Sequence, residues 1–75
     1  MDKIEIIKKY RIAADLSWQE LSDEIGIERK HLQNMVYCNV KPGPRTEHRI
    51  QRWYTRNRAD IEAAIAELEP ITTEG

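Results

Sequence analysis

The segment Leu16–Ile27 constrains the fold of this chain more than any other part of it. Ser17 has the residue type of a helix N-cap, and Glu20, three residues later, completes the pattern of a capping box. Gly26 suits the left-handed backbone conformation that commonly ends a helix. The segment therefore predicts a short capped helix over residues 18–25, a tight glycine turn, and the entry to a second helix.

The remainder of the chain also carries helical signals. Apolar side chains with helical spacing predict helices over residues 4–14 and 28–37, and Asp2 precedes the first as a candidate cap. Residues 38–45 contain two prolines and a glycine, and we expect them to form a loop before a helix capped by Thr46. No segment has the pattern of a strand of any length, so the sequence predicts an all-α fold of four or five helices.

Two short helices joined by a tight glycine turn make a helix-turn-helix unit, whose second helix commonly enters the major groove of DNA. When Leu32, Met35 and Val36 are placed in the core, the opposite side of the 28–37 helix faces solvent. Basic and amide side chains lie on that side, and such groups donate to guanine or pair bidentately with adenine. The outward residues are Lys30, Gln33, Asn34 and Tyr37, with Arg29 and His31 at the flanks.

Charge is distributed unevenly along the 75 residues. The net charge is −1, but residues 1–28 carry −3, residues 29–58 carry +7 and residues 59–75 carry −5. The basic middle third is compatible with nucleic acid, because local fields govern phosphate binding more than the total charge does. The loop residues Lys41 and Arg45 are the leading candidates for phosphate contacts. The other candidates are Asn39, Arg49, Arg52, Arg56 and Arg58, of which the last three can equally pair with the acidic tail.

The C-terminal third allows two organisations. Residues spaced alternately four and three apart favour one helix from Thr46 to Glu69, whereas Asn57 as an N-cap favours a separate second helix. We expect residues 1–57 to form the helix-turn-helix domain, and residues 58–69 to form an amphipathic helix in the same domain or in a dimer interface. Residues 70–75, which begin with a proline, are expected to be a frayed tail.

These features resemble the lambda-repressor-like, Cro/C1-type helix-turn-helix family over about two-thirds of the chain, roughly Ile4 to Tyr54. The residues that carry the resemblance are Arg11, Leu16-Ser17, Glu20-Leu21-Ser22, Ile25-Gly26-Ile27, Leu32, Met35, Pro42, Ile50 and Tyr54. The resemblance implies a five-helix, usually dimeric domain that binds a pseudo-palindromic operator with its third helix in the major groove. Carried over position by position, it implies base contacts by Arg29, Lys30, His31, Gln33 and Asn34.

Three positions depart from the family's pattern. Trp18 stands where the family usually has a glutamine that contacts the DNA backbone; an indole N–H can still donate to phosphate, and the equal alternative is that Trp18 is a packing residue. Val36 replaces a glutamate that often pairs with the arginine of the first helix, so Arg11 is expected to have another partner. Cys38 replaces a frequent glycine, which changes the loop that follows. The expected phosphate contacts are thus Trp18, Asn39, Lys41 and Arg45.

One helix-turn-helix unit reads only a few base pairs, so we expect a homodimer. The expected dimer interface is the apolar stripe of Ile61, Ile65 and Leu68; the alternative is that this stripe packs on the first helix, against Ile4 and Ile7. The expected function is that of a sequence-specific transcriptional regulator of double-stranded DNA, such as a small phage or plasmid repressor. The alternatives are an architectural excision or directionality factor and a protein-interaction module of the antitoxin kind.

Other function classes find little support in the sequence. There is no glycine-rich phosphate loop and no nucleophile with a plausible base, so we expect no catalytic residues, cofactor or small-molecule substrate. Two distant histidines and one cysteine do not make a metal-binding pattern; the lone Cys38 fits a reducing cytoplasm and is expected to be partly buried. A cytoplasmic protein without membrane contact is expected, because no signal peptide or long apolar run is present.

Overall fold

The computed structural model describes residues 2–68, and within them all regular secondary structure is helical. The helices are α1 (Lys3–Ala13), α2 (Trp18–Ile25), α3 (Arg29–Tyr37) and α4 (Pro44–Leu68). The prediction of an all-α fold is therefore confirmed for the described part of the chain, and α2 has the predicted bounds. The expected helix end at Glu69 and the tail at 70–75 lie outside the described residues.

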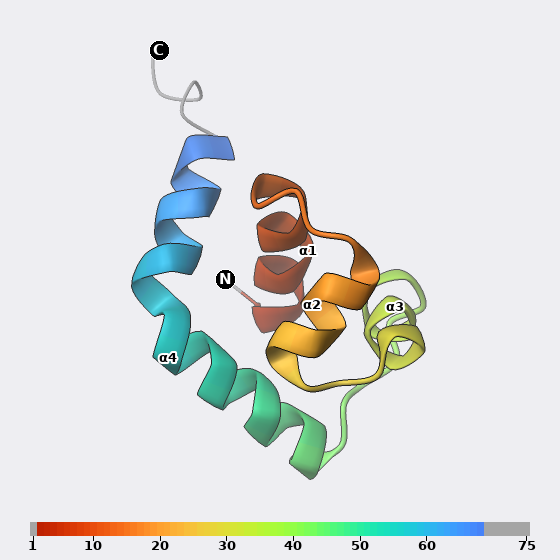
Figure 1. The fold of residues 1–75 in the computed structure, drawn as a ribbon. Coiled ribbons are helices and arrows are strands. Elements are labelled where there is room, and N and C mark those ends of the chain that lie inside the picture. Colours follow the sequence, from red (N-terminus) through yellow and green to blue (C-terminus); the bar gives the residue numbers. More distant parts are fainter. Residues whose placement is uncertain (1, 69–75) are drawn as a thin grey trace.

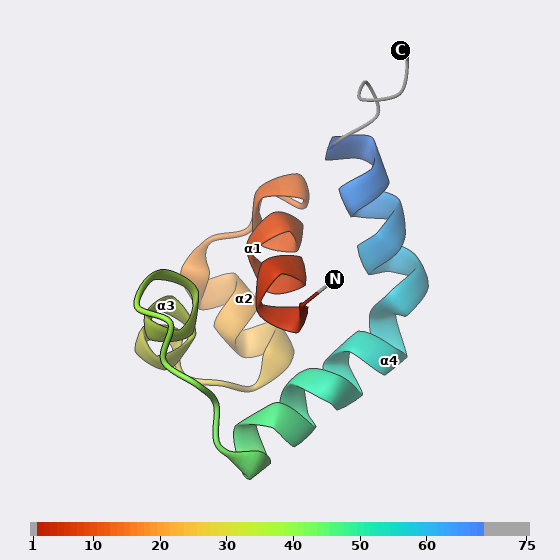
Figure 2. The ribbon, with the colours of Figure 1, turned by 180° about the vertical axis from the view of Figure 1, so that it is seen from behind.

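Helix α4 forms one side of the molecule, and α1 and α2 lie between it and α3 (Figures 1 and 2). It bends at Asn57, whose φ of −116° and ψ of 18° are not helical. The amide nitrogen of Asn57 donates to the carbonyl of Trp53 at 3.0 Å, which satisfies a backbone acceptor at the bend. The first half of α4 packs below α2, and the second half runs beside α1.

The bend resolves the two organisations that the sequence allowed for the C-terminal third. Helix α4 spans Pro44 to Leu68, but Asn57 is not helical and divides it at a kink into two helical halves, so neither alternative holds in full. Asn57 acts through its side chain on the preceding turn and does not cap a separate helix. The helix therefore wraps around the core instead of leaving it.

The start of α4 corrects one prediction. The helix begins at Pro44 and not after Thr46, and the amide of Glu47 donates to the carbonyl of Gly43 at 2.9 Å. Proline is well suited to the first position of a helix, because its missing N–H would have no partner there and its φ is already helical. Arg45 consequently lies in the first turn of α4 and not in the loop.

The core is small and draws on every helix. It is centred on five fully buried side chains, one or more from each helix, and Trp53 is also buried within it. Tyr10 of α1 meets the Trp53 ring edge-on, with 5.6 Å between ring centroids. The core consists of Ile6, Ile7, Leu21, Ile25, Ile27, Leu32, Met35, Ile50, Trp53 and Ile61.

Candidate nucleic-acid interface

The connection between α2 and α3 is held by hydrogen bonds at both ends of α2. At the N-terminus, the amide of Glu20 donates to the Ser17 hydroxyl at 3.0 Å, and the Glu20 carboxylate accepts from the Ser17 amide at 2.8 Å. At the C-terminus, Gly26 is left-handed, with φ 85°, and its amide donates to the carbonyl of Ser22 at 2.8 Å. The Ser22 hydroxyl donates to the carbonyl of Ile27, which is buried in the core. These bonds leave the turn little freedom to change the angle between α2 and α3.

Helix α3 has one buried side and one solvent-facing side. Leu32 and Met35 are buried, and Val36 packs against the core, as predicted. On the other side, Arg29 and Lys30 are exposed, whereas the remaining candidates are half-buried along the helix. The half-buried candidates are His31, Gln33 and Asn34. None of these five side chains makes a hydrogen bond or ion pair with another described residue, so their donors and acceptors are available to a ligand.

Trp18, the first residue of α2, takes part in a stack that joins three helices. The guanidinium of Arg11 lies over its ring, 4.6 Å from the centroid, and Tyr37 of α3 meets it edge-on at 5.7 Å. Trp18 is half-buried by these contacts, whereas Tyr37 is 62% exposed. The indole therefore packs α2 against α1 and α3, which is the packing alternative for Trp18.

Arg11 contacts Leu16 and Trp18, and not a glutamate of α3. Its guanidinium donates to the carbonyl of Leu16 at 3.2 Å, across the turn between α1 and α2. Its Nε is buried and has no hydrogen-bond partner. The stacking on Trp18 offsets part of the free-energy cost of this unpaired N–H group, because the ring face attracts a cation.

The segment between α3 and α4 carries the remaining predicted phosphate contacts. Asn39 is left-handed, with φ 55°, and Lys41 is exposed. The amide of Val40 donates back to the carbonyl of Asn34 at 3.3 Å, which ties the segment to the last turn of α3. Cys38 is exposed, which corrects the expectation that it is partly buried: it follows the last helical residue of α3 and points away from the core.

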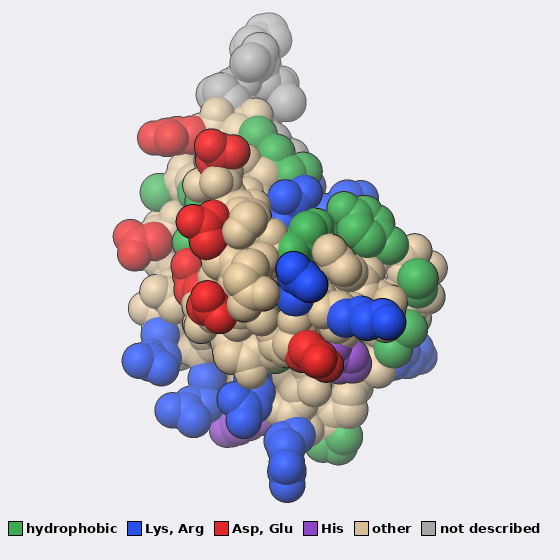
Figure 3. Space-filling model, turned by 45° about the vertical axis from the view of Figure 1, so that its right-hand side comes forward, with side chains coloured by type: hydrophobic (Ala, Val, Ile, Leu, Met, Phe, Trp, Pro, Cys, Tyr) green, Lys and Arg blue, Asp and Glu red, His purple; other side chains and the backbone are tan. Residues whose placement is uncertain are grey.

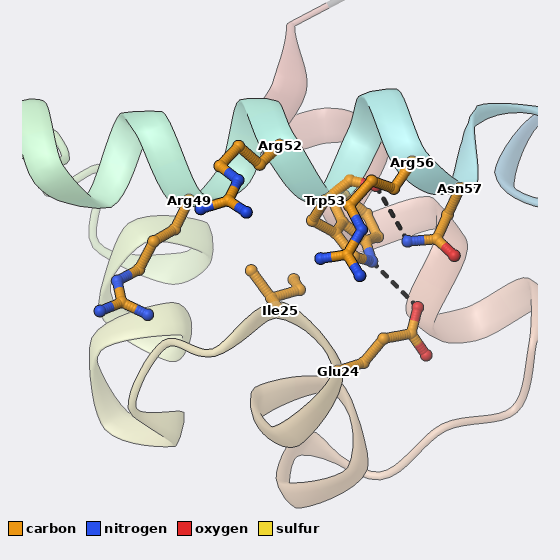
Figure 4. Close-up of a pocket in the computed structure, with 7 residues that line it drawn as sticks. All are labelled: Glu24, Ile25, Arg49, Arg52, Trp53, Arg56 and Asn57. Atoms are coloured by element: carbon orange, nitrogen blue, oxygen red, sulfur yellow. Dashed lines mark hydrogen bonds between the residues drawn. The ribbon is translucent and has the colours of Figure 1, made fainter.

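Three arginines of α4 line a groove against the end of α2 (Figure 4). Arg49 donates to the carbonyl of Gly26 at 3.3 Å, and Arg52 and Arg56 follow along the same side of the helix. Glu24 is the acidic residue in the lining of this groove, and its carboxylate accepts from the Trp53 indole at 2.9 Å. Sequence reasoning missed the groove, although the spacing of the arginines by three and four residues is a signal for a shared helix face.

Glu24 also affects Tyr10. The pKa of the Tyr10 hydroxyl is raised, first because the group is partly buried and second because it hydrogen-bonds to the Glu24 carboxylate. The Tyr10 hydroxyl is therefore neutral and a donor at neutral pH. The hydrogen bond from the Trp53 indole joins Glu24 of α2 to α4, and the raised pKa of Tyr10 reflects the closeness of this carboxylate to α1.

Arg58 pairs within its own helix. Its Nε donates to the Glu62 carboxylate at 3.0 Å, and the Tyr54 hydroxyl donates to the same oxygen at 3.2 Å. These hydrogen bonds lower the pKa of Glu62, with the contribution of Arg58 the larger. The expected pairing of arginines with acidic residues of the C-terminal segment is therefore present for Arg58, whereas Arg52 and Arg56 have no such partner among the described residues.

The predicted dimer stripe does not lie on one exposed surface. Ile61 is fully buried in the core of the chain itself, which corrects its assignment to a dimer interface. Ile65 is half-buried and packs against the core, and Leu68 is 40% exposed. The bend at Asn57 is the physical reason, because it turns the second half of α4 toward α1 and carries the stripe inward.

The described residues contain no group of three or more histidine, cysteine, aspartate or glutamate side chains placed to hold a metal ion. Over the same residues, no helix combines the length and apolar character needed to cross a bilayer. Figure 3 shows how the charges are arranged: basic side chains follow the lower edge and right half of this face, and acidic side chains gather at its upper left. Comparison of the chain with known protein families, curated proteins and solved structures finds no match.

Proposed function

We propose that this chain is a sequence-specific DNA-binding transcriptional regulator in which α2, the glycine turn and α3 act as a helix-turn-helix. The observation that carries the proposal is the outward side of α3, where basic and amide groups have no partner within the described chain. Recognition of base edges requires unpaired donors and acceptors on a helix that is held in place by the burial of its other side in the core.

The rigidity of the unit supports the same proposal. A reading helix must hold its side chains in one register on the duplex, and the Ser17–Glu20 capping box and the left-handed Gly26 restrict α2 relative to α3. Arg29 and Lys30 lie in the first turn of α3, which in helix-turn-helix proteins is the end that reaches the base edges. These two residues, with His31 beside them and Gln33 and Asn34 one turn later, are the proposed base contacts.

Phosphate contacts would position this helix on the duplex. Lys41, in the segment after α3, and Arg45, in the first turn of α4, are both exposed. Asn39 and the half-buried Trp18 are the other proposed contacts; the indole N–H of Trp18 makes no hydrogen bond to another described residue. Contacts of this kind contribute affinity and orientation but carry little sequence information.

Selection from a pool of random duplexes, followed by fluorescence-anisotropy titration at several salt concentrations, tests the proposal. We expect a defined site that binds at least about 1,000-fold more tightly than random DNA. We also expect the logarithm of the binding constant to fall linearly with the logarithm of the salt concentration. Absence of salt-dependent binding would contradict the proposal and favour a protein-interaction module. A footprint over a tandem array, instead of one palindrome, would favour an architectural role.

A further inference from the structure

One exposed face of α4 is basic in its first half and acidic in its second. With about 100° of rotation per residue, the charged residues of this face fall within one sector of the helix, and all of them are exposed. We refer to this face as the charged stripe. The charged stripe consists of Arg45, Arg49, Arg52, Arg56, Asp60 and Glu67, with the small residues Ala59 and Ala63 in the same sector.

The bend at Asn57 does not move the two halves of the charged stripe to different sides of the helix. Ile50 and Trp53, before the bend, and Ile61, after it, are all buried in the same core. The side of α4 that faces away from the core is therefore continuous from one half to the other. Figure 3 shows basic side chains along the lower edge of one face of the molecule and acidic side chains at its upper left.

The charges of the stripe are not neutralised within the chain. Arg52, Arg56, Asp60 and Glu67 make no hydrogen bond or ion pair with another described residue. Arg49 and Glu67 are eighteen positions apart on one helix, or roughly 27 Å along its axis, and so cannot reach each other. The contrast is with Arg58, which lies outside the stripe and is paired with Glu62.

The spacing within the two halves is the same. Arg49 and Arg56 are seven positions apart, and so are Asp60 and Glu67, which is about 10.5 Å or two helical turns. When two such helices run antiparallel, one register places Arg56 opposite the partner's Asp60 and Arg49 opposite the partner's Glu67. The two-fold axis repeats both pairs, so the arginines of each copy face the carboxylates of the other copy.

We propose that the charged stripe of α4 is a self-complementary surface that pairs antiparallel with the same stripe of a second copy of this chain. This register is centred on position 58, so Ala59 lies next to the symmetry axis and Ala63 lies more than one turn from it; the small side chains of both allow the helices to approach closely. The arginine-lined groove beside α2 then receives carboxylates from the partner. This interface would replace the apolar stripe that the sequence favoured, whose Ile61 is buried in the core.

A second copy fits this surface better than a nucleic acid does. A phosphate backbone laid along α4 would meet Asp60 and Glu67 directly after the arginines, and like charges repel. The proposed pairing also leaves the outward side of α3 uncovered, since it uses α4 and the groove between α4 and the end of α2. The pairing does not depend on DNA binding, and self-association is measured without DNA, so it can fail or succeed separately from the proposed function.

Charge reversal across the symmetry axis tests the register. In Arg56→Glu, two glutamates meet the partner's Asp60 residues; in Asp60→Arg, two arginines meet the partner's Arg56 residues. Each variant alone therefore replaces two attractions by two repulsions, and we expect self-association at least about tenfold weaker than that of the parent. In an equimolar mixture of the two variants, the pairs are again of opposite sign, so we expect a mixed dimer with the affinity of the parent.

The measurement is sedimentation velocity of the full chain over a range of protein concentrations at about 50 mM and about 500 mM salt, with circular dichroism to confirm that each variant is folded. The parent should dimerise more weakly at the higher salt, where charges are screened over shorter distances. Arg58→Glu is the matched control, because it makes the same charge change on α4 outside the stripe.

Three outcomes would overturn the proposal. The first is a parent chain that stays monomeric at low salt and at several hundred micromolar. The second is a mixture of Arg56→Glu and Asp60→Arg that associates no better than either variant alone. The third is an Arg56→Glu variant that self-associates like the parent while its affinity for DNA falls, which would make Arg56 a phosphate contact.

Discussion

Replacement of Ile61 by alanine tests whether the second half of α4 belongs to the core of the single chain. The Ile61 side chain is fully buried, so the substitution removes apolar contacts and leaves a cavity. Changes of this kind cost about 2–5 kcal/mol, and a buried site on a packed helix supports a value near 3 kcal/mol. A domain of this length has a total stability of only about 4–11 kcal/mol, so the loss would be a large fraction of it.

The assay is urea unfolding followed by circular dichroism at two protein concentrations tenfold apart. Because Ile61 packs within its own chain, the loss in unfolding free energy should be the same at both concentrations; an interface residue would give a loss that changes with concentration. Leu68→Ala is the matched control, since Leu68 is on the same helix but 40% exposed, and it should cost less than about 1 kcal/mol. A cost for Ile61→Ala no larger than that of the control would refute the reasoning.

Three further predictions follow from the local geometry. Ser17→Ala removes the hydroxyl that caps α2 and should lower the unfolding free energy by about 0.5–2 kcal/mol in thermal or urea unfolding; no change would show that the cap is not formed in solution. The pKa of Glu62 lies below its ordinary value because Arg58 donates to it, so any stability from this pair is present above the ordinary pKa of glutamate and is lost as the pH falls through the lowered one. NMR titration should show that Arg58→Ala returns the Glu62 pKa toward its ordinary value, and an unchanged pKa would exclude the pair. If Lys41 and Arg45 contact phosphates, alanine at either should weaken specific and non-specific DNA binding alike and reduce the salt slope by about one; altered sequence preference with an unchanged slope would reverse their roles.

The helices with strong local signals were predictable from the sequence. The capping box at Ser17 and the glycine at position 26 act on neighbouring backbone groups, so no distant contact is needed to set the bounds of α2. Asp2 likewise accepts a hydrogen bond from the amide of Ile4, as expected for a cap. The outward side of α3 also followed from periodicity, because Leu32 and Met35 fix which side is buried.

Features that depend on competition or on distant contacts were not predictable in the same way. Pro44 and Thr46 both offer a helix start, and the sequence alone does not show that the proline position prevails. Asn57 permits a cap or a bend, and the choice is made by packing of α4 on α1. The arginine groove requires α4 to approach the end of α2, an approach that no local pattern encodes.

The central claim is that α3 reads base edges, and the affinity of Lys30→Ala and Asn34→Ala for a selected site tests it most directly. Both side chains lie on the solvent-facing side of α3, so both variants should fold like the parent by circular dichroism. Loss of a good base contact costs about 1–3 kcal/mol of binding free energy, which raises the dissociation constant at the selected site by about 5- to 150-fold. Lys8→Ala, an exposed lysine on α1, is the charge-matched control and should leave discrimination between the selected site and random DNA unchanged. Folded Lys30→Ala and Asn34→Ala variants that both bind the selected site as tightly as the parent would contradict the account.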